Sequence, residues 1–405
     1  MKAEARGPAD AWLSASEASR LLGVTRATLY AYVSRGFVRS QASSGASRER
    51  TYSRDDVERL RRRTEERRAP DKAAAHALQW GMPILESSIA LIDGARLYYR
   101  GLDAAVLARS RALEEVAALI WTGGFDTLRA PAPAARLPQP GAGVPFAARA
   151  QSMLAVAAAR DPLAFDLRPA SVAATGVRIL RLLTQAAIGA DPGNRTIDAA
   201  LARAWKTGAR GADVVRAALV LCADHELNVS SFTARCVASS ASHPYAVVIA
   251  GLAALEGPKH GGASIRVESM LESLRQARPL RAAVSARLRR GEPIDGFGHP
   301  LYREGDPRAR LLLDLLGERY GKSAEYRFVK EFARAAADTT GQYPNIDFGL
   351  AAVARVLNLP AGSPFTLFAI GRTVGWLGHA IEQYATGQLI RPRAKYVGVP
   401  PAQVS

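Results

Sequence analysis

The sequence predicts an all-α fold for most of the chain, with a small helix, turn, helix and hairpin module before it. Three observations support this. Ala/Leu-rich segments recur at helical spacing between 103 and 385, strand signals are few, and a stretch rich in turn residues and arginine comes first. With 405 residues and a hydrophobic fraction of 48%, the chain is long enough for a large core beside a small domain.

The amino-terminal stretch has the pattern of a winged helix-turn-helix domain. Helical spacing over 14–22 is followed by a Gly-containing turn and a second helix over 26–35. Short strands are expected at 37–39 and 50–52, and Ser53 can cap a third helix. Helix, tight turn, helix, hairpin and helix is the order of elements in that domain.

Composition divides the chain into a domain over 1–68, a linker over 69–80 and a helical domain over 81–405. Helices are expected in the last of these over 103–121, 171–188, 196–205, 212–222, 243–255, 307–318, 323–338, 348–357 and 364–385. A hairpin is expected around Asp93-Gly94, and five prolines between 130 and 145 predict a loop.

Charge and cysteine content limit the classes of partner and the cellular compartment that fit the sequence. The formal net charge of +17 favours polyanionic partners, either nucleic acid or phosphorylated small molecules, and residues 1–70 alone hold 15 Lys and Arg against 9 Asp and Glu. Cys222 and Cys236 are the only cysteines, which excludes a disulfide framework and fits a reducing compartment. Neither a signal-peptide core nor an apolar run of membrane-spanning length occurs, so a cytoplasmic protein without membrane contact is expected.

Three histidines stand in informative surroundings. His225 lies in A-D-H-E-L-N, His260 in G-P-K-H-G-G and His299 in G-F-G-H-P-L-Y. Glycines beside a histidine let the backbone approach a ligand closely. Asp347 follows P-N-I where a loop enters an apolar helix, so it is either a helix cap, a catalytic base or both.

Other reaction classes lack their motifs. The sequence has no H-E-x-x-H, no histidine pair four residues apart and no Cys/His cluster, which disfavours a zinc site. It also has no G-x-S-x-G elbow, no P-loop and no G-x-G-x-x-G loop. A serine hydrolase, a P-loop enzyme and a dinucleotide enzyme are therefore disfavoured.

Six motifs taken together resemble the citrate synthase family. In order they are A-D-H-E-L-N at 223–228, G-P-K-H-G-G at 257–262, G-F-G-H-P-L-Y-R-x-x-D-P-R at 296–308, P-N-I-D-F at 344–348, G-R-T-V-G-W at 371–376 and R-P-R at 391–393. The resemblance runs from Leu85 to about Gly398. It implies the all-α citrate synthase fold, with large and small helical subdomains, and a homodimer whose active site is shared between subunits.

The resemblance implies three catalytic residues. His260 would hydrogen-bond the thioester carbonyl and stabilise its enol, and Asp347 would remove the proton from the acyl carbon. His299 would polarise the ketone of oxaloacetate and protonate the developing alkoxide. A base can deprotonate so weak a carbon acid only if the enol oxygen is stabilised as it forms, which preorganised donors achieve.

The resemblance also implies the binding residues. His225, Arg308 and Arg372 would hold the dicarboxylate, Arg391 would reach it across the dimer interface, and Arg303 would meet a CoA phosphate. Guanidinium groups match planar carboxylates with paired hydrogen bonds, so converging arginines suit a dicarboxylate. The acyl-CoA is a substrate here, and no metal or redox cofactor is expected.

Departures from the family's usual pattern lie beside the catalytic residues. Lys259 precedes the first catalytic histidine where an apolar residue is usual, and Phe348-Gly349-Leu350 replaces a more polar sequence. These changes leave the reaction class intact and lie close enough to alter the acyl pocket. Acetyl-CoA and propionyl-CoA therefore both remain open as substrates.

Residues 14–60 resemble the MerR/excisionase helix-turn-helix group, in which the second helix enters the major groove and the wing meets phosphates. The candidate DNA-binding residues are Thr25, Arg26, Thr28 and Tyr30 on the helix and Arg48 and Arg50 on the wing. The alternative is a small basic module that docks to protein.

Two functions remain open. The first is condensation of acetyl-CoA or propionyl-CoA with oxaloacetate to citrate or 2-methylcitrate, on a chain with a DNA-binding module. The second is a transcription regulator whose synthase-like domain senses oxaloacetate or acyl-CoA without turnover. Retention of His260, His299 and Asp347 favours the first, because ligand binding alone requires no base.

Overall fold

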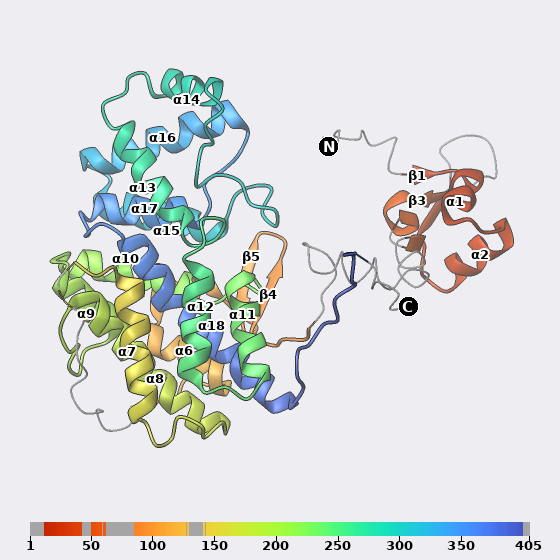
Figure 1. Ribbon diagram of the computed structural model, residues 1–405. Helices are drawn as coiled ribbons and strands as arrows, with labels where there is room; N and C mark the ends of the chain where they lie inside the picture. The colour runs from red at the N-terminus through yellow and green to blue at the C-terminus, as the bar shows by residue number, and fades with distance from the viewer. Residues whose placement is uncertain are drawn as a thin grey trace. The chain divides into compact units, whose positions relative to one another are not determined.

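The computed structural model describes residues 12–42, 50–58, 60–61, 85–126, 128, 141 and 143–399 (Figure 1). The chain forms two compact units, Met1–Glu86 and Ser87–Ser405. The predicted linker over 69–80 and the candidate residue Arg48 lie outside the described residues.

The first unit packs two helices against a small antiparallel sheet. Its elements are β1 (Trp12–Leu13), α1 (Ala15–Leu22), α2 (Arg26–Ser34), β2 (Ser40–Ala42) and β3 (Arg50–Ser53), and residues 54–58 and 60–61 are helical. The strand order is β1-β3-β2. A small apolar core closes it, made of Leu13, Ala18, Leu29, Val38, Tyr52 and Val57.

Local signals set the helix ends in this unit. Ser14 and Glu17 form a reciprocal capping box at the start of α1, and Gly23 ends that helix in the left-handed region at φ 65°. Thr25 caps α2 by accepting a hydrogen bond from the backbone N–H of Thr28. These are the helix ends that the sequence predicts.

The predicted strand at 37–39 is wrong, because the hairpin pairing starts at Ser40 opposite Tyr52. The backbone N–H of Arg39 donates to Asp56 Oδ2 (3.0 Å) instead of joining the ladder. The Arg39 guanidinium binds the same carboxylate, with Nε 2.7 Å from Oδ2.

The second unit is mostly helical, as predicted. Its strands are β4 (Ala90–Asp93), β5 (Arg96–Tyr99) and β6 (Leu102–Asp103), in one antiparallel sheet of order β4-β5-β6. Its helices are α5 (Ala104–Ser110), α6 (Leu113–Thr122), α7 (Phe146–Arg160), α8 (Pro169–Ile188), α9 (Ile197–Ala204), α10 (Gly208–Leu221), α11 (Val229–Ser239), α12 (Pro244–Leu255), α13 (Ala263–Ser273), α14 (Leu280–Arg289), α15 (Pro307–Tyr320), α16 (Ala324–Thr340), α17 (Ile346–Val356) and α18 (Ser363–Thr386).

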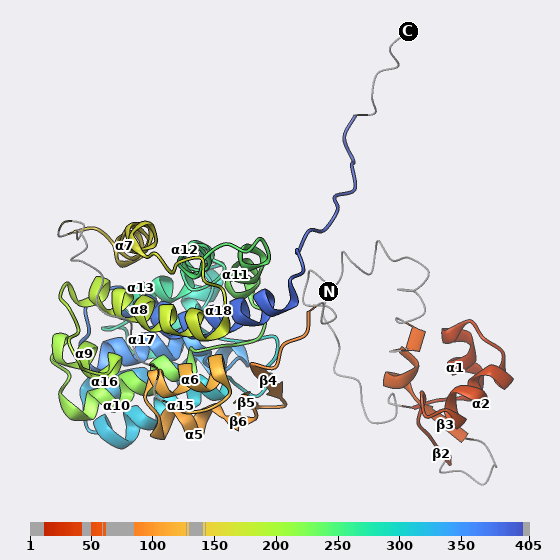
Figure 2. The same cartoon turned by 90° about the horizontal axis from the view of Figure 1, so that it is seen from below.

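Helix α18 runs through the interior of the second unit (Figures 1 and 2). It packs against α6, α8, α10, α11, α12 and α17. Nearly all of its side chains from Ser363 to Ile381 are buried, including the polar Arg372 and His379. A polar side chain on a helix that is enclosed on all sides is unfavourable unless neighbouring polar groups contact it. Arg372 and His379 are therefore expected to have polar neighbours in the core.

Helices α13 to α17 gather at one end of the unit, where α10 packs on α15 and α17 (Figure 1). Within that group α14 packs on α16, and α15 and α13 pack on α17, while α17 and α13 also touch α18. This matches the predicted large and small helical subdomains. Helices α13 and α17 therefore lie where the two groups of helices meet.

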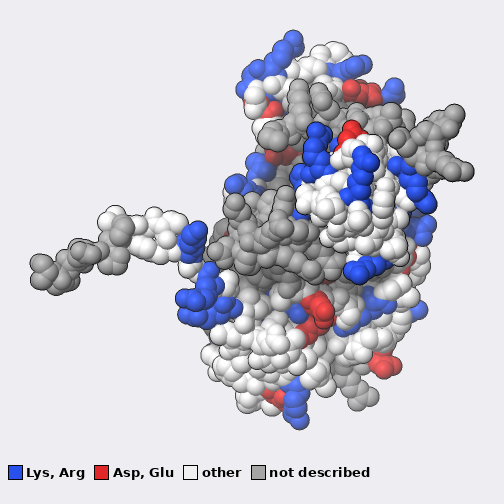
Figure 3. All heavy atoms as spheres, turned by 90° about the vertical axis from the view of Figure 1, so that its right-hand side faces the viewer, with Lys and Arg blue, Asp and Glu red and all other residues white. Residues whose placement is uncertain are grey.

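Surface charge follows the composition. Lys and Arg side chains outnumber Asp and Glu side chains on the face that Figure 3 shows. Among the helices that the structure describes, none is long and apolar enough to cross a membrane.

Candidate active site

His260 lies in a tight loop between α12 and α13. Two backbone hydrogen bonds close the loop, from His260 N to Gly257 O (2.9 Å) and from Gly262 N to Leu255 O (3.1 Å). A Cβ atom on Gly262 would lie 2.5 Å from the Glu256 carbonyl oxygen. Gly262 is thus required because its backbone packs directly against the backbone of Glu256. The sequence context had suggested only that a glycine here lets a ligand approach the backbone.

Ser230 holds the His260 ring in place. The serine hydroxyl oxygen lies 2.8 Å from His260 Nε2 and 2.9 Å from Asn228 Oδ1, and it accepts a hydrogen bond from Trp376 Nε1–H (3.1 Å). Burial lowers the pKa of His260 to about 4, and the charge of Arg372 acts in the same direction. The imidazole is therefore neutral at neutral pH.

His225 and His299 meet at Tyr302. The two imidazole centroids lie 5.2 Å apart in an edge-on arrangement, and the Tyr302 hydroxyl lies 3.0 Å from His225 Nε2. The backbone N–H of Leu301 donates to His299 Nδ1 (3.1 Å). Burial and the nearby Arg308 lower the pKa of His299 to about 4 and that of His225 well below its ordinary value.

Arg308 forms a buried ion pair with Asp306. Nε donates to Oδ1 (2.9 Å) and Nη2 to Oδ2 (2.7 Å), and the two side chains are 3% and 0% exposed. Burial alone would raise the pKa of Asp306, but the guanidinium beside it lowers that pKa. The same carboxylate raises the pKa of Arg308 against its own burial. Both groups are therefore charged inside the protein.

Asp347 stands in the first turn of α17. Asn345 is the cap of that helix, because its Oδ1 accepts hydrogen bonds from the backbone N–H of Asp347 (3.0 Å) and Phe348 (3.4 Å). Asp347 is thus not the helix cap, which removes the structural explanation that its sequence position allowed.

One oxygen of the Asp347 carboxylate is buried without a hydrogen-bond partner among the described residues, although the residue as a whole is partly exposed. Its Oδ1 is buried and receives no hydrogen bond from any donor that the structure describes. Burial raises the pKa of Asp347 to about 7, while the charge of Arg308 opposes that rise. A carboxyl group that titrates near neutral pH in a pocket of charged residues is typical of a catalytic base.

The segments that carry His299 and Asp347 are joined. Phe297 pairs with Pro344 in an isolated antiparallel bridge, and backbone hydrogen bonds run from Gly298 N to Tyr343 O and from Asn345 N to Gly296 O, both 2.8 Å. The Asp306 carboxylate also accepts from the backbone N–H of Ile346 (3.1 Å). These contacts fix the two segments relative to each other.

Arg372 lies inside the protein on α18. Its Nε donates to the Cys222 carbonyl oxygen (2.7 Å), and its guanidinium carbon lies 4.9 Å from the Phe368 ring centre. A Cβ atom on the preceding Gly371 would lie 2.4 Å from the Leu219 carbonyl oxygen. The small residue lets α18 approach the end of α10, which brings Arg372 close to the segment that carries His225.

The structure brings six of the candidate residues together. Arg308 and Arg372 both act on the pKa values of His225 and Asp347, Arg372 acts on His260, and Arg308 acts on His299. Arg303 is exposed in the turn before α15, and Arg391 is exposed in the segment after α18.

The amino-acid sequence matches known families over both units. Residues 77–393 match the family model described as citrate synthase, C-terminal domain. The chain belongs to the citrate synthase family. Residues 13–64 match the model of the MerR HTH family regulatory protein, so the first unit is a MerR-family helix-turn-helix domain.

Relatives in this family differ in how much of their length aligns. The chain is 39% identical to a citrate synthase of Synechocystis over 46% of this chain and 49% of that protein, so it spans about half the length of that relative. It is 29% identical to the Haloferax volcanii citrate synthase over 78% of this chain and 94% of the relative. It is also 33% identical to the Shewanella oneidensis 2-methylcitrate synthase over 47% and 52%.

Solved structures of citrate synthases share the fold. The Thermotoga maritima citrate synthase superposes with a TM-score of 0.66 at 28% identity, covering 80% of this chain and 96% of that one. The Thermoplasma acidophilum citrate synthase superposes with a TM-score of 0.67 at 24% identity, covering the same shares. The citrate synthase fold predicted for the second unit is therefore confirmed.

In the MerR-family domain, the described candidates lie on the second helix and the wing. Arg26 and Tyr30 are exposed one turn apart on α2, and Arg50 is exposed on β3. Thr25 and Thr28 hydrogen-bond each other at the start of α2, with 3.0 Å between their hydroxyl oxygens. The threonines thus serve the helix cap, and the other three side chains remain at the surface.

Several residues of the site are not predicted by the sequence. They are Ser230, Tyr302, Asp306, Asn345 and His379, each of which contacts a candidate residue or a neighbour of one. Tyr302, Asp306 and Asn345 lie inside the six family motifs, and Ser230 lies two residues after one of them. Considering every polar residue in and next to these motifs would therefore have identified four of the five. Among the described residues, no group of three or more His, Cys, Asp and Glu side chains could hold a metal ion.

Proposed function

We propose that this citrate synthase-family protein condenses an acyl-CoA, either acetyl-CoA or propionyl-CoA, with oxaloacetate. The products are citrate or 2-methylcitrate and CoA. The observation that carries the proposal is the Asp347 carboxylate, whose buried oxygen has no donor among the described residues and whose pKa is raised to about 7. The charges of Arg308, Arg266 and Arg372 favour the ionised form of this carboxyl group, and the nearby Asp306 carboxylate opposes it.

The first step is removal of a proton from the acyl carbon. Asp347 takes this proton, and the electron pair moves onto the thioester oxygen to give an enol or enolate. His260 donates a hydrogen bond to that oxygen. The Ser230 hydroxyl oxygen lies 2.8 Å from Nε2 and fixes the ring, and the neutral tautomer with its proton on Nδ1 is the one that donates to the thioester oxygen.

The second step forms the carbon–carbon bond. The acyl carbon attacks the ketone carbon of oxaloacetate, and the ketone oxygen becomes an alkoxide that takes up a proton. Leu301 N–H donates to His299 Nδ1, so the neutral ring carries its proton on Nε2 and directs it at the ketone. Water then attacks the thioester carbonyl of the CoA adduct, which releases CoA and the tricarboxylate.

The arginines bind the dicarboxylate in this proposal. Arg308 and Arg372 are buried and offer guanidinium groups to the two carboxylates, and His225 supplies a further polar contact beside Tyr302. Arg391 of a second copy is proposed to complete the site in a homodimer, consistent with its exposure after α18. Arg303, exposed near His299, is proposed to meet a CoA phosphate.

The MerR-family domain is proposed to bind DNA. Arg26 and Tyr30 on α2 would reach base edges in the major groove, and Arg50 on the wing would contact phosphate. The basic balance of residues 1–70 supports this use.

The test is CoA release from acetyl-CoA, and separately from propionyl-CoA, by the purified full chain with oxaloacetate. Turnover is expected with at least one thioester, and Asp347→Asn is expected to reduce kcat by at least about a hundredfold because the base is lost. Relative kcat/KM values then rank the two acyl substrates.

Asp338→Asn serves as the matched control, because Asp338 is an exposed carboxylate paired with Arg334 at 3.7 Å. It is expected to keep wild-type turnover. No CoA release with either thioester, together with saturable oxaloacetate binding, would reject the enzyme and favour a regulator that senses its ligand.

A further inference from the structure

Asp224 is a buried carboxylate directly before His225 in the chain. Its side chain is 0% exposed, and neither of its oxygens accepts a hydrogen bond from a described donor. The polar neighbour of this carboxylate is the ring of His379, with Nε2 3.2 Å from Asp224 Oδ1. A buried carboxylate without a partner is strongly unfavourable, so this contact decides where the Asp224 side chain lies.

The segment that holds Asp224 rests on α18 through three successive contacts. Arg372 Nε donates to the Cys222 carbonyl oxygen (2.7 Å), and the backbone N–H of Gly375 donates to the Ala223 carbonyl oxygen (2.8 Å). Asp224 then meets His379, one turn further along α18. The three contacts lie in the same order on both segments, so α18 sets the position of residues 222–224 and hence of His225.

Close approach makes this arrangement tight. A Cβ atom on Gly375 would lie 2.4 Å from both the Ala223 carbonyl oxygen and Asp224 Oδ1. Burial lowers the pKa of Arg372, and the charge of Asp224 is the largest influence acting against that effect. Asp224 therefore touches α18 and helps keep Arg372 charged.

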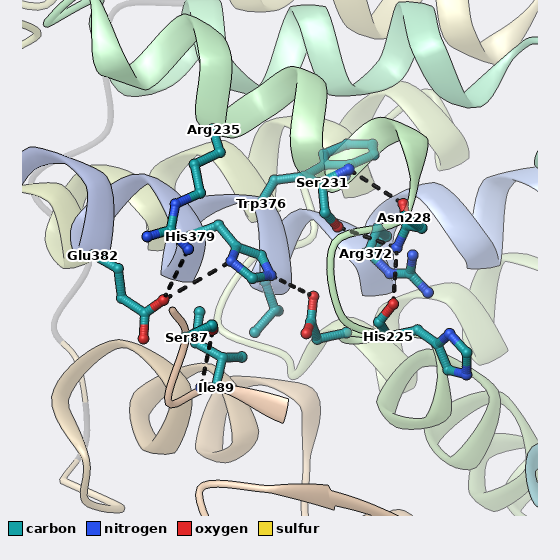
Figure 4. A network of polar contacts seen from close by, with 12 residues as sticks. Ser87, Ile89, His225, Asn228, Ser231, Arg235, Arg372, Trp376, His379 and Glu382 are labelled. Atoms are coloured by element: carbon teal, nitrogen blue, oxygen red, sulfur yellow. Dashed lines mark hydrogen bonds and ion pairs between the residues drawn. The ribbon is translucent and has the colours of Figure 1, made fainter. Parts of the chain in front are cut away.

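His379 is itself held from the other side (Figure 4). Its Nδ1 lies 3.9 Å from Glu382 Oε2, and the Glu382 carboxylate accepts hydrogen bonds from the backbone N–H and the hydroxyl of Ser88, both 2.8 Å. Arg235 of α11 also faces Glu382, at 3.5 Å. The imidazole is thus fixed between two carboxylates, one of which belongs to the segment that leads into the candidate site.

We infer that His379 is a positioning residue for dicarboxylate binding: it holds Asp224, which places His225 and balances the charge of Arg372. The inference rests on the proposed function, in which those two residues bind oxaloacetate. His379 touches no substrate in this scheme. It acts on the oxaloacetate half of the site, and the acyl-CoA half depends on it much less.

Two substitutions of His379 separate this role from simple packing. His379→Gln places an amide N–H near the position of Nε2, where it can keep a polar contact with Asp224, whereas the shorter His379→Asn reaches only the Nδ1 side toward Glu382. Oxaloacetate Kd is measured by calorimetry on the full-length protein, with folding checked by circular dichroism. His379→Asn is expected to weaken oxaloacetate binding about tenfold, and His379→Gln less than about threefold.

The KM of the acyl-CoA is expected to change less than about twofold in both variants, because neither substitution touches the acyl-CoA half of the site. His243→Asn is the matched control, because His243 caps α12 through Ala246 N–H and asparagine is also a good cap. It is expected to leave oxaloacetate binding unchanged. Equal weakening by the Gln and Asn variants, or equal weakening of both substrates, would overturn the inference.

Asp224→Asn provides a second test if His379→Asn does not fold. It keeps the size of the side chain and removes its charge, so oxaloacetate binding is expected to fall by about the same factor. Wild-type affinity in a folded Asp224→Asn protein would also overturn the inference. Because binding is measured directly, a protein without turnover would reject the proposed function while the Kd values still decide the role of His379.

Discussion

The carboxylate of Asp306 binds the guanidinium of Arg308 through two hydrogen bonds of 2.9 and 2.7 Å, with both side chains inside the protein. The same carboxylate accepts from the backbone N–H of Arg308 (3.0 Å) and of Ile346 (3.1 Å). One acidic side chain thus caps α15, orients Arg308, for which we propose a role in substrate binding, and hydrogen-bonds the first residue of α17. The position of Asp347, next to Ile346, follows from this contact.

Asp306→Asn is expected to destabilise the protein by about 3–5 kcal/mol, because it leaves the buried Arg308 charge without its partner. Denaturant unfolding at pH 7 measures the change. Asp166→Asn is the control, since Asp166 pairs with Arg168, whose side chain is 83% exposed, and a much smaller loss is expected there. Similar losses in the two variants would contradict a special role for the buried pair.

Asp347→Asn is expected to stabilise the protein at pH 8 while it abolishes turnover. The folded-state pKa of Asp347 is raised to about 7, above its unfolded value, so the stability this group contributes is full below about pH 4 and is lost as pH rises toward 7. The asparagine variant lacks that loss. Its advantage should be about 1 kcal/mol at pH 4.5 and on the order of 4 kcal/mol at pH 8.

Thermal unfolding of both proteins between pH 4.5 and 8 measures this difference. A variant whose advantage stays constant across the range would show that Asp347 does not titrate in that window. A variant less stable than wild type at pH 8 would show that its carboxylate contributes to the fold.

The rate of condensation is expected to rise with pH as Asp347 ionises. Because the base acts in its ionised form and its pKa is about 7, kcat/KM should increase about tenfold per pH unit below 6 and level off above 8. His260 and His299 have pKa values lowered to about 4, so they remain neutral across this range and add no second transition. Measurement of kcat/KM for both substrates from pH 5 to 9 tests the profile. A plateau that extends down to pH 5 would remove Asp347 as the titrating base.

Helix α18 shows what local patterns can predict. Its predicted range of 364–385 differs by one residue at each end from the observed Ser363–Thr386, because a long apolar pattern, an early proline and Gly387 define it. The predicted helix over 103–121 is instead two helices, α5 and α6. Arg111 is extended at φ −118°, and the Glu115 carboxylate accepts from the Ala112 N–H (2.8 Å) to start the second helix.

In the candidate site, too, some features could be predicted from local sequence and others could not. Motif residues predicted His225, His260, His299, Arg308, Asp347 and Arg372, which the fold brings together. The contact of Asp224 with His379 joins positions 155 residues apart in the sequence and appears in no local pattern. The helices α7, α11, α13 and α14 were also missed. In α13 and α14 arginine and serine interrupt the apolar spacing, and the burial of these helices comes from tertiary packing.

Gly375→Ala is expected to weaken both the fold and oxaloacetate binding. The added methyl group would lie 2.4 Å from the Ala223 carbonyl oxygen, so α18 and the segment before His225 must separate. Overpacking of this kind destabilises by about 1–3 kcal/mol. Denaturant unfolding and oxaloacetate calorimetry measure the two effects.

Gly124→Ala is the control for that substitution, because its added methyl group would meet only Asp126 Oδ2, at 4.0 Å. Its free energy of unfolding should change by less than about 1 kcal/mol. Normal oxaloacetate affinity in Gly375→Ala would show that the Asp224 segment can shift without affecting the ligand.

Arg50→Ala is expected to lower the affinity of the full-length protein for duplex DNA of any sequence. Arg50 is exposed on β3 of the wing, and in the proposed complex its guanidinium contacts phosphate. Each phosphate contact contributes about 0.9 to the slope of log K against log salt concentration, so the slope should become shallower by about that amount. Fluorescence anisotropy with a labelled duplex at several salt concentrations between about 50 and 200 mM measures both the affinity and the slope.

Arg281→Ala is the matched control, because Arg281 is an exposed arginine on α14 of the second unit. Its removal changes the net charge by the same amount as Arg50→Ala. If DNA binding reflected only the excess of 54 Lys and Arg over 37 Asp and Glu, the two variants would lose affinity equally. A loss of DNA affinity only in Arg50→Ala would assign the contact to the wing. Equal losses in both variants would show that DNA binding reflects the overall positive charge and not the wing.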